Sequence, residues 1–167
     1  NARIALKKLK GLKTTLLKNH DNYNLGGSIK VAFNYAIENN YDFMITLHGD
    51  DQGDLSDLNK VIINKNYLNF SCLRAGRFKP GSKLLGYSKF RIFGNHIFRH
   101  IYSALLNKKV YDIGAGLATY KIEDIKKTNF QYFINDMSFD SFMLLIMDYH
   151  KLEFDFINVT WKEEDQI

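Results

Sequence analysis

The chain has 167 residues, and 46% of them are hydrophobic, which is enough apolar material for the core of one domain. A single proline, a single cysteine and a charged fraction of 25% exclude a disordered, collagen-like or disulfide-stapled chain. The net charge of +5 fits several anionic partners, namely nucleic acid, acidic lipid headgroups and phosphorylated substrates, without choosing among them.

The order of the predicted elements indicates an α/β layered domain that occupies residues 1–167 without repeats or linkers. Periodicity and turn residues predict, in chain order, the end of a helix at 2–10, a strand at 12–19, a helix at 27–39, a strand at 42–48, a helix at 55–65, a strand at 69–76, a helix at 87–107, a strand at 115–121, a short helix from Ile122, a helix that includes Phe139 and Ile146, and a strand at 153–161.

Several of these elements carry further expectations. The nearly continuous apolar run at 42–48 is typical of a parallel strand that is covered on both faces. Cys72 is expected to pack unpaired within a strand, which suits a reducing cytoplasm. The helix at 87–107 has an apolar face formed by Phe90, Phe93, Ile97, Ile101 and Ala104. The longest apolar run, at 142–147, is far shorter than the roughly 20 residues that cross a bilayer.

Acidic residues gather where the strand at 42–48 ends. Asp50 and Asp51 follow it directly, and ligands of open α/β sheets bind at the carboxyl ends of strands. Hard divalent cations favour one or two carboxylates together with phosphate oxygens, so these residues predict a metal-diphosphate site. The alternative is that acids merely cap the next helix, an interpretation that suits Asp54 and Asp57 better than Asp50.

The long helix also has a polar stripe. Arg91, Asn95 and Arg99 recur every fourth residue opposite the apolar face, and with Arg77 upstream they could present cations to an anion. The alternative is an ordinary solvated helix face, which is favoured for Arg99 and Lys89.

Four segments together resemble a known family. They are "NYNLGGSIKVAFNYAIENNYDFMITLHGDDQGDL" at 22–55, "AGR" at 75–77, "DIGAGL" at 112–117 and "NVTWKEEDQ" at 158–166. In this order they are similar to the N-x-G and D-x-D-x-Q block, the G-S-R segment, the D-x-x-S-G-F segment and the closing strand of family two glycosyltransferases of GT-A fold. The branch that they resemble includes dolichol-phosphate mannose synthases and other polyprenyl-phosphate glycosyltransferases.

The resemblance implies a donor site built on Mg²⁺ or Mn²⁺. Asp50 matches the second aspartate of D-x-D and would be both catalytic and a metal ligand, beside Asp51. His48 replaces the first aspartate, and an imidazole can also bind Mn²⁺. The residues that would contact the nucleotide are Asn24, Gly26, Gly27 and Gln52.

For the acceptor, the resemblance implies a polyprenyl phosphate or a glycan. Arg77, Arg91 and Asn95 would contact the acceptor phosphate, and Asp112 would face the reacting centre. The bland alternative for Asp112 is a turn aspartate. A phosphate acceptor is already ionised, whereas a hydroxyl acceptor would require Asp112 as general base.

The implied fold is a GT-A, Rossmann-like mixed sheet flanked by helices and truncated at its N-terminus, because the family's first βαβ unit has no counterpart here. An exposed sheet edge, self-association into a homo-oligomer and weak donor binding are therefore expected. The implied enzyme is inverting and cytoplasmic, with a peripheral contact to the inner face of the membrane. The alternatives are a non-catalytic remnant that binds phosphorylated ligands or a partner protein, and, more distantly, a nucleic-acid-binding module.

Overall fold

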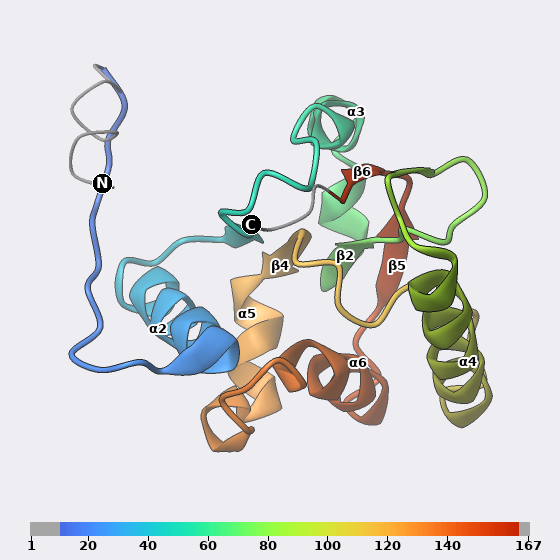
Figure 1. Ribbon diagram of the computed structural model, residues 1–167. Helices are drawn as coiled ribbons and strands as arrows, with labels where there is room; N and C mark the ends of the chain where they lie inside the picture. The colour runs from blue at the N-terminus through green and yellow to red at the C-terminus, as the bar shows by residue number, and fades with distance from the viewer. Residues whose placement is uncertain (1–10, 164–167) are drawn as a thin grey trace.

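The computed structural model describes residues 11–163 and has a mixed α/β architecture with a mixed sheet (Figure 1). The strands are β1 (Phe43–Thr46), β2 (Cys72–Ala75), β3 (Lys83–Leu85), β4 (Ala118–Lys121), β5 (Phe154–Ile157) and β6 (Thr160–Lys162). The helices are α2 (Asn24–Glu38), α3 (Asp57–Ile63), α4 (Lys89–Leu105), α5 (Ile122–Ile125) and α6 (Phe139–Tyr149), with short 3-10 turns at Asn66–Asn69, Lys126–Thr128 and Phe130–Tyr132.

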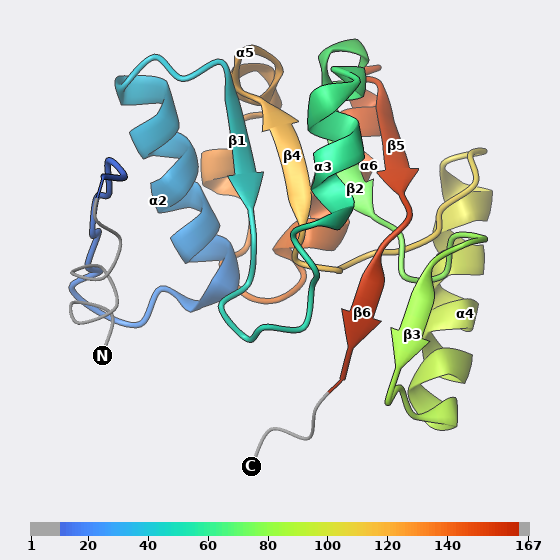
Figure 2. The same ribbon diagram turned by 90° about the horizontal axis from the view of Figure 1, so that it is seen from above.

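The main sheet has the order β1-β4-β2-β5, and a separate two-stranded sheet pairs β3 with β6 (Figure 2). β4 is antiparallel to both of its neighbours, whereas β2 and β5 are parallel. β1, β2 and β5 therefore point the same way and end at one edge of the sheet, and β4 begins at that edge. This arrangement brings the loops after three strands and the loop before a fourth to a common place.

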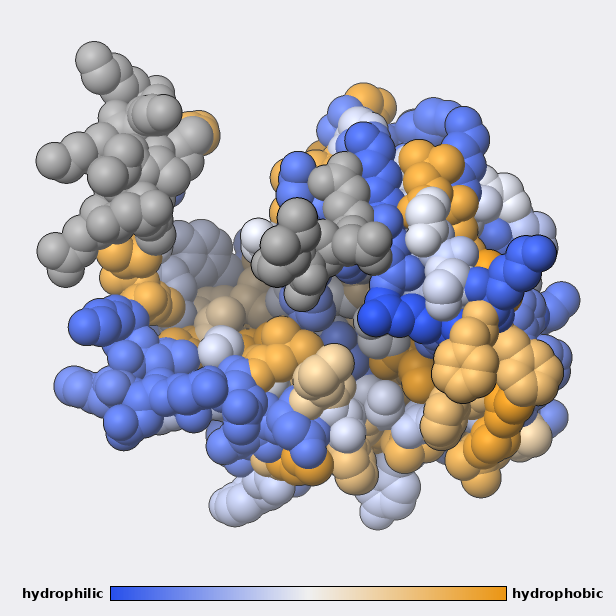
Figure 3. Space-filling view, in the orientation of Figure 1, coloured by the Kyte–Doolittle hydropathy of each residue, from blue (hydrophilic) through white to orange (hydrophobic). Residues whose placement is uncertain are grey.

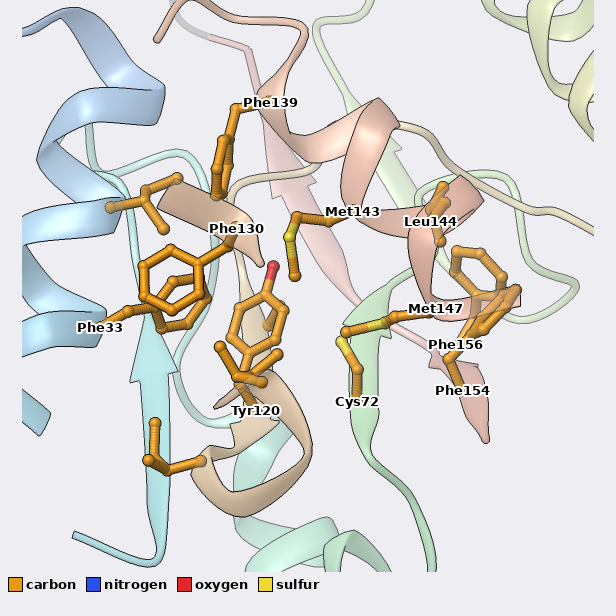
Figure 4. Packing of buried hydrophobic residues seen from close by; sticks show 14 of the residues in the cluster. Phe33, Cys72, Tyr120, Phe130, Phe139, Met143, Leu144, Met147, Phe154 and Phe156 are labelled. Carbon is orange, nitrogen blue, oxygen red and sulfur yellow. The ribbon is translucent and has the colours of Figure 1, made fainter. Parts of the chain in front are cut away.

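The larger core packs α2, α5 and α6 against one face of the sheet (Figure 4). Because side chains alternate along a strand, Cys72 and Tyr120 point into this core while their neighbours point to the other face. Phe33 of α2 contacts the Tyr120 ring edge-on, with the ring centroids 5.0 Å apart. Burial also raises the pKa of the Cys72 thiol to about 12, so this cysteine is an inert core residue.

A smaller core lies on the opposite face, under α3. It contains Leu58, Ala75, Ala115, Leu117, Val159 and Trp161. At the far end of the sheet, Asp124 accepts hydrogen bonds from Ser71 at 2.8 Å and from Lys127 at 2.5 Å. Burial works to raise the pKa of Asp124, but these hydrogen bonds outweigh it and hold the pKa below its ordinary value.

Most predicted elements are present with shorter bounds, and α5 begins at Ile122 as expected. The segment 12–19 is not a strand: it runs beside α2, and Thr15 shares a hydrogen bond with the Tyr35 hydroxyl. The reason is that no strand within 11–163 is placed to pair with it. The predicted helix end at 2–10 lies outside the described residues.

Three other expectations were wrong. β1 is not a parallel strand covered on both faces, because it pairs antiparallel to β4 and its other edge pairs with no described strand. The closing strand breaks between β5 and β6, which belong to different sheets. The apolar face of α4 does not join the core, since none of the helix residues is buried. Within 11–163 no helix is long and apolar enough to cross a membrane.

Candidate functional site

The candidate site lies at the sheet edge where β1 and β2 end and β4 begins. The loop after β1 carries His48 to Gln52, the residue two positions after β2 is Arg77, and the loop before β4 carries Asp112. β6 follows β5 past the same edge and contributes Trp161. Parallel strand direction therefore explains why segments far apart in the sequence meet here.

Arg77 and Asp112 form the centre of the site. Arg77 donates from Nε to Asp112 Oδ2 at 2.7 Å and from Nη2 to Oδ1 at 2.8 Å, a bidentate ion pair. The backbone N–H groups of Arg77 and Gly114 also donate to the carboxylate, at 3.0 and 3.1 Å. Burial works to lower the pKa of Arg77, but the bond with Asp112 outweighs it and raises the pKa above its ordinary value. These bonds fix both side chains in place.

Aromatic side chains hold the Arg77 guanidinium on its other sides. Its central carbon lies 5.3 Å from the centroid of the Trp161 ring and 5.7 Å from that of Tyr87, within cation–π range. Arg77 Nη1 donates to the Tyr87 hydroxyl at 3.0 Å, and Asn95 Nδ2 reaches the same oxygen at 3.5 Å. Two of the predicted acceptor residues, Arg77 and Asn95, are thus joined through Tyr87.

Arg91, the third predicted acceptor residue, lies at the start of α4 and forms an ion pair with Glu163. Its side chain is 63% exposed, whereas the Glu163 side chain is 11% exposed. A surface arginine of this kind can change partners at little cost, because exposed ion pairs are weak. Arg91 is therefore the cation of the site that is best able to turn toward an incoming anion.

His48 packs directly against the loop that carries Asp112. Gly116 has φ +61, and a Cβ atom added there would lie 2.3 Å from His48 Nδ1. Only glycine suits this position, because the conformation is left-handed and the imidazole occupies the space of a side chain. The contact links the β1 loop to the β4 loop.

The loop after His48 runs alongside β6. Asp50 Oδ1 accepts the Gln52 N–H at 3.2 Å, and the Gln52 carbonyl accepts the Lys162 N–H at 2.9 Å. His48 and Asp50 line a cavity of about 500 Å³ with the first turn of α2. Asp51 and Gln52 line another, of about 320 Å³, with Lys162. The loop therefore separates Asp50 from Asp51 instead of pairing the two carboxylates.

The predicted nucleotide residues at the start of α2 have mixed positions. Gly26 and Gly27 are buried, and a Cβ on Gly26 would lie 2.9 Å from the Asn135 backbone, so these glycines allow α2 to approach the loop before α6 closely. Asn24 begins the helix with φ +55. Packing thus accounts for both glycines, and the cavity that reaches Asp50 is lined at this end by the neighbouring Leu25 and Ser28.

The helix-capping alternative holds in part: Asp57 lies in the first turn of α3, but the N-cap is Ser56 and no side chain caps the helix. Asp54 Oδ1 accepts the Ser56 N–H at 2.9 Å in the turn before α3. Asp57 instead accepts the N–H of Thr160 in β6. On α4, Arg99 donates to the Phe78 carbonyl at 3.4 Å and is half-buried, so the expectation of a solvated face is wrong for Arg99, whereas Lys89 is exposed.

Unpartnered polar atoms concentrate in this site. Within 11–163, the buried side-chain nitrogen and oxygen atoms without a hydrogen-bond partner are His48 Nε2, Trp161 Nε1 and Glu163 Oε2. Such atoms are costly unless a ligand or water satisfies them. Trp161, Glu163 and Tyr87 were not predicted as site residues, although the first two lie within the motif at 158–166.

Mg²⁺ or Mn²⁺, implied by the resemblance, fits the available donors. No group of three or more His, Cys, Asp or Glu side chains within 11–163 is arranged to hold a metal ion. A cation shared with a diphosphate needs only one or two protein carboxylates, and the exposed Asp50 lines the same cavity as His48, whose buried Nε2 has no partner.

Comparisons of this chain with protein-family models, with curated proteins and with solved structures found no match.

Proposed function

We propose that this chain carries the acceptor side and part of the donor side of a GT-A glycosyltransferase site, which moves a sugar from a nucleotide-diphosphate sugar to a polyprenyl phosphate. The observation that supports it best is that the bidentate Arg77–Asp112 ion pair and three buried polar atoms without partners lie at the sheet edge where the loop that carries Asp50 leaves β1. Ligand sites of α/β sheets lie at this edge.

The burial of Asp112 and its hydrogen bonds with Arg77 favour a phosphate acceptor over a hydroxyl acceptor. A hydroxyl must lose its proton to a base, but both oxygens of Asp112 accept hydrogen bonds from Arg77, and its side chain is 1% exposed. A phosphate monoester needs no base, because it is ionised at neutral pH. Asp112 then acts as a positioning residue that fixes Arg77, and Arg77 with Arg91 holds the anionic acceptor.

The reaction would be a direct displacement that inverts the anomeric carbon. An acceptor oxygen forms a bond to that carbon while the bond to the donor diphosphate breaks, and the nucleoside diphosphate leaves. Asp50, with His48 at the same cavity, would hold Mg²⁺ or Mn²⁺, which when bound neutralises charge on the leaving diphosphate. Arg91 would exchange Glu163 for the acceptor phosphate.

Calorimetry with Mn²⁺ and a panel of uridine and guanosine diphosphate sugars tests the donor side. Asp50→Asn should weaken Mn²⁺-dependent binding at least tenfold, because it removes the charge of the proposed ligand. Asp54→Asn is the matched control: it changes an exposed acid of the same loop, and asparagine caps a turn as well as aspartate does. Equal donor affinity in Asp50→Asn and the parent would contradict the proposal.

A transfer assay tests the acceptor side. A short-chain prenyl phosphate should accept sugar and the corresponding prenyl alcohol should not. Transfer to the alcohol alone would mean that Asp112 is released from Arg77 to act as a base.

A further inference from the structure

A helix on the surface of a water-soluble protein normally turns its apolar face to the core and its polar face to water. In α4 this arrangement is reversed. The half-buried Asn95 and Arg99 of its polar stripe face inward, where Asn95 Nδ2 reaches the Tyr87 hydroxyl and Arg99 donates to the Phe78 carbonyl. Its apolar face is turned outward, because none of the helix residues is buried and the apolar side chains of this face are exposed. The exposed apolar side chains are Phe90 at 85%, Phe93 at 64%, Ile97 at 46%, Phe98 at 55%, Ile101 at 48% and Leu105 at 67%.

These six side chains form one continuous stripe, which we call the α4 stripe. They recur at helical spacing, so they cover about half of the helix circumference over its whole length. In Figure 3, apolar side chains gather over α4 beside a hydrophilic border. Contiguous apolar surface of this extent marks an interaction site, because water disfavours its exposure.

The charge around the α4 stripe identifies the kind of partner. Residues 89–105 include two arginines, one lysine and two histidines, and no aspartate or glutamate. At about 100° per residue, Lys89 and His100 border one side of the stripe and Arg91 borders the other, and all three are exposed. An apolar face bordered by lysine and arginine is the pattern of a helix that lies in an anionic membrane surface.

A second copy of the chain suits this surface less well. Two α4 helices packed through their stripes would bring Lys89 and Arg91 of both copies together, with no acid on either helix to offset them. The helix also cannot span a bilayer, since no helix within 11–163 has the required length and apolarity. It would therefore lie in the plane of the interface.

We propose that α4 is a membrane-surface helix, which inserts the α4 stripe at the acyl-chain boundary of an anionic bilayer while Lys89, Arg91 and His100 contact lipid phosphates. The proposal rests on α4 alone and does not require sugar transfer. It has a consequence for the candidate site, because Arg91 and Asn95 on the first turns of the helix would then lie next to the lipid headgroups.

Flotation of the full chain with lipid vesicles tests the proposal. The chain should bind vesicles of phosphatidylcholine with 30% phosphatidylglycerol, and should bind pure phosphatidylcholine at least tenfold more weakly. Phe93→Ser/Ile97→Ser should reduce binding to the anionic vesicles at least tenfold, and Lys89→Glu should reduce it about threefold. Ile63→Ser is the matched control, since Ile63 is 76% exposed on α3 and should not contact lipid.

A fluorescence measurement separates insertion from adhesion and does not depend on a serine variant that folds. Trp161 is the one natural tryptophan and is buried, so the difference between Phe93→Trp and the parent reports position 93. Its emission should shift to shorter wavelength with anionic vesicles and be quenched by brominated acyl chains. Absence of vesicle binding, binding that Phe93→Ser/Ile97→Ser leaves intact, or a dimer that this variant dissociates in place of vesicle binding would each overturn the proposal.

Discussion

Replacement of Arg77 by methionine should destabilise the fold more than any other change of a single charge in the site. The Arg77 and Asp112 side chains are 11% and 1% exposed, so the variant would leave a buried carboxylate without its cation. Breaking a buried pair in this way costs about 3–5 kcal/mol. The backbone N–H groups of Arg77 and Gly114 still donate to Asp112, which favours the lower end, about 3 kcal/mol.

Urea unfolding measures this loss directly. With a slope of about 2 kcal/mol per molar, 3 kcal/mol lowers the midpoint by about 1.5 M. Arg91→Met is the matched control, because its ion pair with Glu163 involves a largely exposed arginine and should contribute less than about 1 kcal/mol. Adding Asp112→Asn to Arg77→Met should recover part of the loss, since it removes the uncompensated charge while keeping an oxygen for Gly114.

A loss below about 1 kcal/mol for Arg77→Met, equal to that of Arg91→Met, would refute this reasoning. It would mean that water reaches the Asp112 carboxylate. Asp112 would then be available as a general base.

Three further changes test separate parts of the structure. Arg91→Gln should weaken binding of a short-chain prenyl phosphate by about 1.5–3 kcal/mol in calorimetry and leave donor affinity unchanged; the opposite pattern would assign Arg91 to the donor. Gly116→Ala should cost at least about 1–2 kcal/mol in urea unfolding, because φ is +61 and His48 blocks the new methyl group, whereas Gly114→Ala, which meets no atom within 4 Å, should cost less. Asp124→Asn should cost about 1–2 kcal/mol at pH 7. The pKa of Asp124 is lowered by folding, so its contribution is present above about pH 4 and lost below it, and the loss should shrink there in urea titrations; a pH-independent cost would contradict this.

Local sequence patterns correctly predicted the type and the order of most helices and strands. α2 and α6 follow from apolar spacing. Of the apolar face expected for α6, Phe139 and Met143 are buried, whereas Phe142 is 40% exposed. The sequence could not place the segment 12–19, because a strand exists only where a partner strand is available, and pairing is a long-range property. For the same reason β1 was expected to have parallel neighbours, although β4, more than 70 residues later, pairs with it in the opposite direction.

The candidate site divides in the same way. The sequence by itself determined that carboxylates follow β1, that Arg77 follows β2 and that Asp112 precedes β4, because these positions depend on neighbours along the chain. The tertiary structure alone decided that Asp112 is held by Arg77 and that Tyr87 joins the site through its hydroxyl. It also decided which way α4 faces: the spacing of its apolar residues defines a stripe, but whether the core or the surroundings cover that stripe depends on how the helix packs on the rest of the fold.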